Sequence, residues 1–304
     1  MEYIPAKTIV SKVKYGSSWF GVDYNMNIYR GCSHGCIYCD SRSLCYQNVD
    51  FDQVKAKENA LQKMREELRR KVKSGVIGTG AMSDPYNPFE KKELLTRHAL
   101  ALMDAFDFGV AIATKSALVT RDIDILEDIK AHSPVLVKIT VTTADEELCK
   151  KIEPHVSSVS KRFRAINALA ERGIICGVLM MPILPYINDN ENNIRRIVQE
   201  AKAAGADFVY PAMGMTLREG NREYFYKKLE ESFPGIKEKY IKRFGLRYNC
   251  TSSQAKRLWE SFKEECEKQG MIHDMKSIIN RYKRGYGEQL SLFHNVDGGD
   301  SFIL

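Results

Sequence analysis

Short apolar segments alternate with amphipathic helical segments over roughly the first 215 residues, and this alternation limits the fold more than any other feature. Six segments have the composition of strands: 26–30, 76–82, 109–115, 135–142, 174–181 and 207–212. Helical periodicity separates them, as where Leu61, Met64, Leu68 and Val72 share one face. Strands that alternate with helices predict parallel βα units with right-handed crossovers.

The expected fold class is α/β, as a partial (β/α)6 TIM-type barrel with a helical C-terminal extension. A doubly wound sheet fits less well, because no Gly-x-Gly-x-x-Gly sequence opens the first helix. After Gly214 the strand pattern stops, and helical segments follow at 219–233, 236–244 and 253–268. We therefore expect a barrel over 1–214, a basic helical region over 215–284, and a flexible tail over 285–304.

The basic helical region holds the whole charge excess of the chain. Between Gly235 and Arg284, 13 Lys and Arg face 6 Asp and Glu, a surplus equal to the net charge of +7. Lysines and arginines interleaved with aromatic residues suit a surface that binds the phosphates, and could also contact the bases, of a nucleic acid. A solvated helical face has the same composition, so this feature alone does not decide between them.

Other features of the sequence indicate the cellular compartment of the protein. No apolar run is long enough to span a bilayer, and the N-terminal segment lacks the apolar stretch of a signal peptide. We therefore expect a cytoplasmic protein without a membrane partner. Because cytosolic thiols are kept reduced, the eight cysteines point to metal binding, catalysis or burial rather than disulfides.

Three of these cysteines, Cys32, Cys36 and Cys39, have the spacing C-x-x-x-C-x-x-C just after the first predicted strand. Soft thiolates select zinc or iron–sulfur clusters. A structural zinc site needs four ligands, and Cys45 or His34 would be the fourth. The residues themselves leave both kinds of site open.

With Tyr38 before the last cysteine, this spacing resembles the radical S-adenosylmethionine (SAM) superfamily. The resemblance implies that the three thiolates hold a [4Fe–4S] cluster whose fourth iron stays open for SAM. It also implies reductive cleavage of SAM to a 5′-deoxyadenosyl radical, with flavodoxin or ferredoxin as the electron donor. Under this interpretation, the missing fourth cysteine marks the active site.

Four segments resemble the spore photoproduct lyase-like family in order and spacing: "NIYRGCSHGCIYCDSRS", "MSDPYNPFE", "TKSALVTRDIDIL" and "MPILPYIND". The resemblance implies a cofactor pocket formed by Tyr38, Ser83, Asp84, Lys115, Ser116 and Thr140.

Four of these six pocket residues also have a structural interpretation. Lys115 at a strand end could pair with the methionyl carboxylate of SAM or be an ordinary surface lysine. Ser83 and Thr140 could cap backbone groups, and Asp84 before a proline is common turn chemistry.

One departure from the family concerns the hydrogen-atom donor. Photoproduct lyases use a cysteine near the equivalent of 81–83, and this chain has none there. Tyr86 or Cys45 is the candidate catalytic donor, although Cys45 also fits a small buried thiol. We expect the remaining cysteines to be inert packing residues: Cys149, Cys176, Cys250 and Cys266.

The predicted tail contains a pentapeptide that resembles the motif by which bacterial repair proteins dock on the replicative sliding clamp. Leu290, Leu292 and Phe293 would fill an apolar pocket of the clamp, and Gln289 would fix the register. Such a tether would keep an enzyme near DNA through effective concentration. The alternative is a short apolar patch that folds back on the protein.

Together these features favour a radical SAM enzyme that repairs a damaged base in DNA. An RNA-modifying radical SAM enzyme is the nearest alternative, and a non-catalytic iron–sulfur protein that binds DNA and the clamp is the other. The damaged base would have to leave the stack to meet the radical, which costs least for a lesion.

Overall fold

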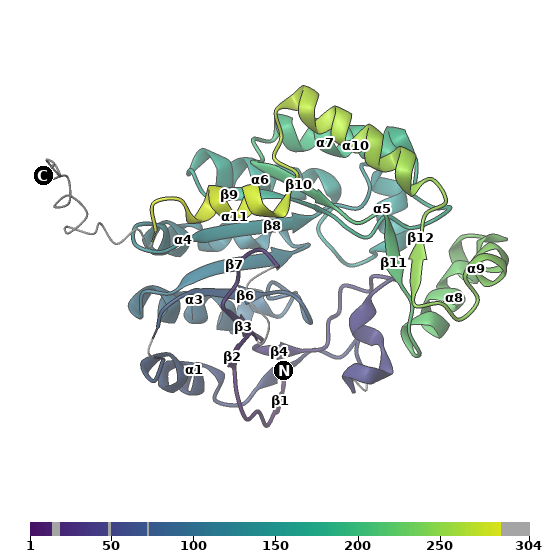
Figure 1. Ribbon diagram of the computed structural model, residues 1–304. Coiled ribbons are helices and arrows are strands. Elements are labelled where there is room, and N and C mark those ends of the chain that lie inside the picture. Colours follow the sequence, from purple (N-terminus) through teal and green to yellow (C-terminus); the bar gives the residue numbers. More distant parts are fainter. Residues whose placement is uncertain (14–18, 48–49, 72, 287–304) are drawn as a thin grey trace, which may run out of the picture.

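The central sheet of the protein has the order β10-β9-β8-β7-β6-β3-β2 in the computed structural model, which describes residues 1–13, 19–47, 50–71 and 73–286 (Figure 1). The strands are β2 (Val10–Lys12), β3 (Tyr24–Met26), β6 (Val76–Thr79), β7 (Gly109–Thr114), β8 (Val135–Thr140), β9 (Ile175–Met180) and β10 (Phe208–Pro211). From β3 to β10 every neighbouring pair is parallel, and only the edge strand β2 runs antiparallel. The predicted α/β class and partial (β/α)6 barrel are confirmed.

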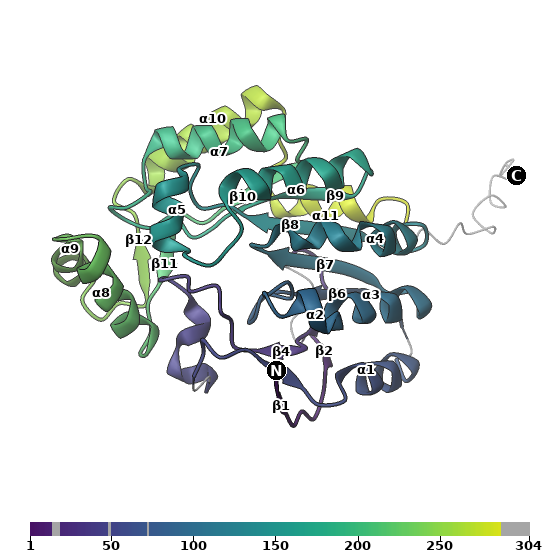
Figure 2. The same cartoon turned by 180° about the vertical axis from the view of Figure 1, so that it is seen from behind.

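Helices connect successive parallel strands and cover the outer face of the sheet, as Figure 2 shows for α3, α4 and α6. They are α1 (Ala60–Arg69), α2 (Glu90–Glu93), α3 (Leu95–Ala105), α4 (Ile123–Lys130), α5 (Glu146–Ile152), α6 (Val159–Glu171) and α7 (Glu191–Ala203). Side chains of Asp145, Ser158 and Asn190 cap the N-termini of α5, α6 and α7. Among the described residues, no helix has the length and apolarity needed to cross a membrane.

The period of two along each strand sends alternate side chains to the two faces of the sheet. On β8, Val137 and Ile139 join the core formed with the outer helices, whereas Leu136 joins a second core inside the barrel. Lys138 and Thr140 therefore share the inner face with Leu136. This alternation brings polar strand-end residues to the interior of the barrel.

The first predicted strand, 26–30, is wrong in detail. The chain leaves the central sheet after Met26, and β4 (Tyr29–Arg30) pairs instead with β5 (Lys55–Lys57). A third strand, β1 (Glu2–Ile4), completes this small separate sheet. The continuous apolar pattern hides the break, because Ile28 and Tyr29 are buried in either arrangement.

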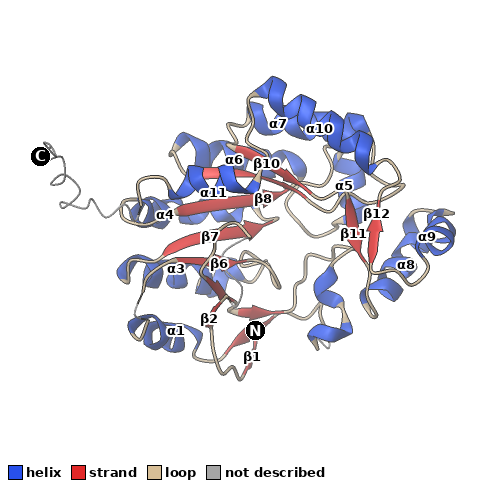
Figure 3. Cartoon of the chain, in the orientation of Figure 1, coloured by secondary structure: helices blue, strands red, loops and turns tan. Residues whose placement is uncertain are grey.

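The C-terminal part contains α8 (Asn221–Ser232), α9 (Ile236–Phe244), α10 (Ala255–Gln269) and α11 (Met275–Lys283), in agreement with the three predicted helical segments. The expectation that strands stop after Gly214 is wrong. Strands β11 (Gly214–Thr216) and β12 (Asn249–Thr251) form an antiparallel pair beside α8 and α9 (Figure 3). Three-residue strands are too short to give a recognisable alternation.

Two helices of this part pack on the barrel. Arg195 of α7 binds Glu264 and Glu265 of α10. On the opposite face of the sheet, α11 covers the inner core (Figure 1), and the Tyr282 hydroxyl donates to the carbonyl of Phe20 at 2.6 Å. The predicted domain boundary near residue 214 stays a prediction.

Candidate cofactor and substrate cavity

A cavity of about 670 Å³ opens where the parallel strands end. Successive strand ends contribute Gly80, Lys115, Thr140, Met181 and Ala212 to its wall. The thiol-bearing loop, an N-terminal segment and the β11–β12 pair supply most of the rest, including Trp19, Tyr38, Cys39, Asp40, Ser41, Met215, Thr216, Asn249 and Thr251. Barrel enzymes place their active sites at this end, and the volume lies in the range of small-molecule sites.

The three predicted cluster ligands lie on the thiol loop, which we define as residues 31–39, between β4 and the 3-10 helix η1 (Asp40–Arg42). The loop begins at Gly31, whose φ is +78°. A β-carbon there would come within 2.5 Å of the Gln53 carbonyl, so only glycine allows this close passage. Next to it, the amide of Cys32 donates to the carbonyl of Phe51 at 2.8 Å. The loop is therefore anchored at its start.

The chemistry of the three thiols fits an iron–sulfur cluster. Burial raises the pKa of Cys32 to about 12 and that of Cys36 well above its usual value. A cluster ligand has to be a thiolate, and bound iron would supply the positive charge that stabilises it there. In the described ranges, no three His, Cys, Asp or Glu side chains converge on a single metal ion. A cube does not require that convergence, because each thiolate binds a different iron.

The two residues considered as a fourth zinc ligand have other partners. His34 is buried, and its Nδ1 lies 3.4 Å from Asp84 Oδ2. The sulfur of Cys45 lies 3.3 Å from a guanidinium nitrogen of Arg218. Cys45 is exposed, so its interpretation as a buried thiol is wrong. It sits on the short turn η2 (Leu44–Tyr46), where Leu44 is also 61% exposed.

Asp84 connects the ends of two strands. Its carboxylate accepts from the Thr114 hydroxyl at 2.7 Å and from the Lys115 amide at 2.8 Å. It also accepts from the Tyr86 amide at 2.9 Å, which is the turn that the sequence suggested. Asp84 therefore forms the expected turn and has a second role as well. Its carboxylate fixes the backbone from which the Lys115 side chain extends.

Lys115 lies in the cavity wall, partly exposed, with its ammonium 5.7 Å from the centre of the Tyr38 ring. Desolvation lowers the pKa of Lys115, but the nearby groups of Cys36, Glu153, Cys39 and Asp84 raise it above its usual value. The ammonium therefore stays charged. A cation at this place, next to the thiol loop, can bind an anionic group such as a carboxylate.

Tyr38 belongs to a buried polar network behind the thiol loop. Its hydroxyl donates to Glu153, and Thr142 donates to the same carboxylate oxygen at 3.2 Å. Arg162 binds the other oxygen at 2.6 Å and also donates to the Thr140 carbonyl at 2.8 Å. Burial would raise the pKa of Glu153, but the charges of Arg162 and Lys115 and the hydrogen bonds from Tyr38 and Arg162 lower it.

The other predicted pocket residues divide into two groups. Thr140 lines the cavity together with Tyr38 and Lys115. Ser116 lies outside the lining, and its hydroxyl caps a 3-10 helix by accepting from the Leu118 amide at 3.3 Å. Ser83 is buried outside the lining as well. The structure thus brings three of the six residues to the cavity and gives Asp84 a supporting position.

Tyr86, a predicted hydrogen-atom donor, does not reach the cavity. Its side chain is 1% exposed and packs in the outer core. Its hydroxyl makes no hydrogen bond within the described part of the chain, and burial raises its pKa well above the usual value. The guanidinium of Arg121 lies 5.9 Å from the ring centre. The four cysteines expected to be inert packing residues are all buried, and their inertness stays a prediction.

The sequence interpretation missed the far wall of the cavity. Asp40, next to the last thiol, accepts from the Thr216 hydroxyl of β11 at 2.9 Å. Asn249 and Thr251 of β12 complete this wall. A β-carbon on Gly214 would lie 2.8 Å from backbone atoms of β12, so glycine permits the close pairing of the strands. Gly214 was therefore a sequence feature that could have indicated this strand pair.

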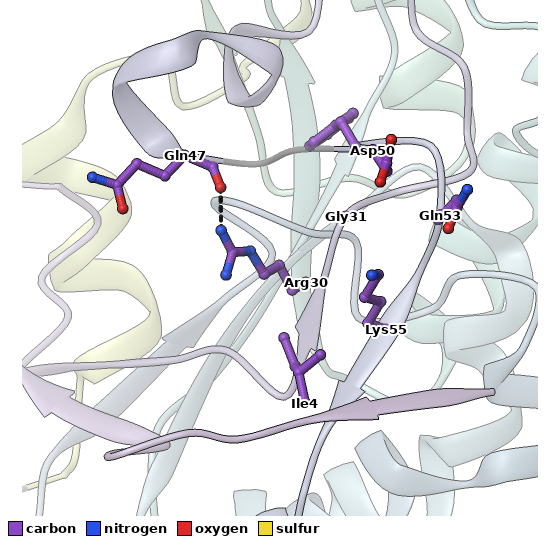
Figure 4. A pocket seen from close by; sticks show the side chains of 8 residues that line it. Ile4, Arg30, Gly31, Gln47, Asp50, Gln53 and Lys55 are labelled. Carbon is purple, nitrogen blue, oxygen red and sulfur yellow. Dashed lines mark hydrogen bonds between the residues drawn. The ribbon is translucent and has the colours of Figure 1, made fainter.

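A second pocket, of about 330 Å³, lies outside the cavity (Figure 4). Arg30 crosses it and donates to the backbone carbonyl of Gln47, and Ile4 and Lys55 border it. None of the three thiols lines this pocket. We therefore assign the chemistry to the larger cavity.

The predicted basic surface is present on α9, where Lys239, Lys242 and Arg243 are exposed. The helix lies next to α8 and the β11–β12 pair (Figure 1). The clamp-like residues Gln289, Leu290, Leu292 and Phe293 lie outside the described residues.

The family model of the Radical SAM superfamily matches residues 26–198, which is more than half of the chain. An uncharacterized protein of Mycobacterium tuberculosis is 29% identical over 225 residues, covering 71% of this chain and 66% of the relative. An uncharacterized protein of Methanocaldococcus jannaschii is 31% identical over 222 residues, covering 72% of this chain and 81% of the relative. The match therefore spans just under two thirds of the mycobacterial relative.

Solved structures show a similar fold. Spore photoproduct lyase complexed with dinucleoside spore photoproduct has a TM-score of 0.64 and 16% sequence identity, covering 89% of this chain and 81% of that chain. A point mutant of the same enzyme has a TM-score of 0.65 and 15% identity, with the same coverage. At this identity the likeness concerns the fold alone.

Proposed function

This chain belongs to the radical SAM superfamily, and we propose that it is an enzyme that uses a [4Fe–4S] cluster and SAM, acts on DNA and repairs a damaged base. The cofactors supply reductive cleavage of SAM to a 5′-deoxyadenosyl radical. The observation that carries the proposal is a single cavity lined by Cys39, by Lys115 and Thr140 at strand ends, and by β11 and β12.

We assign the cofactor side of this cavity to the thiol loop and the strand ends. Cys32, Cys36 and Cys39 hold the cluster, and the Lys115 ammonium binds the carboxylate of SAM. Tyr38 and Thr140 shape the pocket around SAM. Asp84 orients the Lys115 backbone through the bonds described above, so we class it as a positioning residue.

The substrate side is assigned to the β11–β12 wall and Trp19. Asp40, Thr216, Asn249 and Thr251 offer hydrogen-bonding groups for the edge of a base, and Trp19 offers an aromatic face. The solved complex of spore photoproduct lyase contains a dinucleoside lesion in the same fold, which supports this class of substrate. A carbon–carbon lyase reaction or related radical chemistry is the corresponding proposal for the reaction.

The basic face of α9 supports a polymeric substrate over a free nucleoside. Lys239, Lys242 and Arg243 can bind phosphates that flank the extruded base.

Two protein partners are also part of the proposal. One is a sliding clamp, docked through Gln289, Leu290, Leu292 and Phe293, and the other is flavodoxin or ferredoxin as the reductant. The cytoplasmic location belongs to it too, because cluster thiolates must stay reduced.

The test is anaerobic. With the cluster reconstituted and reduced, release of 5′-deoxyadenosine is measured alone, with intact DNA, with ultraviolet-irradiated DNA, and with RNA. We expect stimulation by irradiated DNA only, together with a reverted base among the products. Stimulation by RNA would favour the RNA-modifying alternative. Tight DNA binding without any SAM cleavage would favour the non-catalytic protein.

A further inference from the structure

The thiol loop has a second accessible face, which borders a groove of about 660 Å³ outside the cavity. Ser33, Gly35 and Ile37 of the loop form one side of this groove. Lys151 at the end of α5 and Tyr224 and Lys228 of α8 are among the residues on its other sides. The groove thus touches the loop between the proposed ligands Cys32, Cys36 and Cys39.

One face of the thiol loop lines the cavity, and the other lines the groove. Tyr38 and Cys39 line the cavity, whereas Ser33, Gly35 and Ile37 line the groove. A molecule in the groove is therefore separated from the cavity by the loop itself. An electron that enters from the groove reaches the cluster site without passing through the space for SAM and substrate.

Backbone hydrogen bonds fix the side of the groove that the thiol loop forms. The amide of Ile37 donates to the Ile152 carbonyl at 3.0 Å, and the amide of His155 donates to the His34 carbonyl at 3.1 Å. Gly35 has a φ of +70°, and a β-carbon there would lie 3.0 Å from Pro154 and His155. The loop side of the groove is therefore preformed, which lowers the ordering cost of docking a partner there.

The charge of the groove favours an acidic partner. Lys150, Lys151 and Lys228 line it, against the carboxylates of Asp52 and Glu231. The two carboxylates are paired within the protein, Asp52 with Arg42 and Glu231 with Lys228, so the positive charge left for a partner is that of Lys150 and Lys151.

The two lysines of α5 remain available. Lys150 is paired only across one helix turn, with the exposed Glu147 at 2.6 Å. Lys151 is exposed and has no carboxylate within ion-pair distance in the described part of the chain. Neighbouring lysines of this kind attract an acidic surface and speed its association.

We propose that this groove docks an acidic electron-carrier protein with a flavin or iron–sulfur centre, which reduces the cluster. The carrier loses one electron and the cluster gains it, and no covalent bond forms or breaks. The inference rests on the proposed function, because it requires a redox-active cluster on the thiol loop. It adds to that function a place where the reductant binds.

The experiment compares two reductants on the cluster-loaded enzyme. The double variant Lys150→Glu/Lys151→Glu reverses the charge of the groove, and Lys91→Glu/Lys92→Glu makes the same change at two adjacent exposed lysines of α2. Release of 5′-deoxyadenosine is followed with reduced flavodoxin at low salt, and separately with dithionite, which needs no docking surface.

We expect the groove variant to lose about tenfold of the flavodoxin-driven rate at low carrier concentration, with the loss shrinking at high salt. Its dithionite-driven rate and both rates of the α2 variant should match those of the unmodified enzyme. An unchanged flavodoxin-driven rate in the groove variant, or an equal loss in the α2 variant, overturns the proposal.

A binding measurement separates this proposal from the function on which it rests. Oxidised flavodoxin is titrated against each protein by calorimetry, without turnover. Weaker binding by the groove variant alone supports docking even if its cluster content falls, and equal binding by all proteins contradicts it. If instead the unmodified enzyme releases no 5′-deoxyadenosine with dithionite, the proposed function fails on its own.

Discussion

Glu153 and Arg162 form an ion pair whose two side chains are both fully buried, with Arg162 Nη2 2.6 Å from Glu153 Oε2. The pair binds Tyr38 of the thiol loop on one side and the carbonyl of Thr140 on the other. It therefore joins the loop to the end of β8. Such a pair contributes less to net stability than to the placement of what it holds, which here is the wall of the cavity.

Replacement of Glu153 by Gln should be costly, because it leaves the Arg162 guanidinium buried without its counter-charge. We expect a loss of about 3–5 kcal/mol in the free energy of unfolding, measured by urea denaturation. We also expect lower iron occupancy after reconstitution, since Tyr38 loses a charged acceptor. Glu147→Gln, on the helix α5 that Glu153 follows, is the control, because Glu147 is 78% exposed and should change stability little. A cost below about 1 kcal/mol would contradict this role.

Asp84→Asn should weaken SAM binding more than it weakens the fold. The amide keeps one acceptor oxygen, but the substitution removes the charge that three donors share. With Lys115 less well oriented, we expect about tenfold weaker SAM binding to the cluster-loaded protein by equilibrium dialysis. Asp107→Asn, at a side chain that is 82% exposed, serves as the control. SAM affinity equal to that of the unmodified protein would remove Asp84 from the positioning role.

Lys138 should make the stability of the fold depend on pH. Its side chain faces the barrel interior, with its ammonium 4.6 Å from the centre of the Phe20 ring, and burial lowers its pKa to about 7. The unfolded chain therefore binds more protons than the folded chain between pH of about 7 and the usual lysine pKa of 10.5. Stability should rise with pH across this window.

Lys138→Met removes that dependence. The variant should be more stable than the unmodified protein by roughly 2–4 kcal/mol at pH 7, with the difference shrinking toward pH 10. Urea denaturation at several pH values checks this, and Lys92→Met, at an exposed position, should leave the pH profile unchanged. A pH-independent difference between Lys138→Met and the unmodified protein would contradict the assignment.

Substitutions of Cys39 and Cys45 test two different steps, namely binding of the cluster and return of a hydrogen atom to the repaired base. Cys39→Ala should lose most of its iron and all 5′-deoxyadenosine release, as judged by iron analysis and chromatography. Cys45→Ala should keep both, because Cys45 lies outside the cavity lining. If Cys45 is nevertheless the hydrogen-atom donor, its variant will still cleave SAM but yield less repaired base. Retained iron in Cys39→Ala would count against the proposed ligand set.

Phe293→Ala tests the clamp-like tail. We expect at least about tenfold weaker binding to a bacterial sliding clamp, because a buried aromatic anchor carries much of the affinity of such a motif. Fluorescence anisotropy with the full-length chain measures this, and Ser291→Ala is the matched change within the motif. Equal clamp affinity of the Phe293→Ala variant and the unmodified chain would end the docking hypothesis.

Strand positions were predictable where burial was continuous. The segments 109–115, 135–142, 174–181 and 207–212 match β7, β8, β9 and β10 to within two residues at each end. Central parallel strands are buried on both faces, so their sequences stay apolar throughout. The break after Met26 and the β11–β12 pair were not predictable in this way, because pairing choices of two- and three-residue strands leave almost no periodic signal.

The site was predictable where it depends on local spacing and not where it depends on distant contacts. The thiol triad and Lys115 follow from motifs within one segment each. The Glu153–Arg162 pair depends on how the chain turns between α5 and α6, and Thr216 meets Asp40 across 176 positions of sequence. Tyr86 shows the converse, since its motif suggested chemistry and its burial places it in the outer core.

The packing of α11 against Phe20 has a consequence for synthesis of the protein. The inner core combines residues near both ends of the described chain, such as Phe20 and Tyr282, with Leu136 and Phe208 of the central strands. A ribosome delivers all the parallel strands before it delivers α11. The nascent barrel therefore exposes its apolar interior until about residue 282 emerges, and during that interval it is a natural client for chaperones.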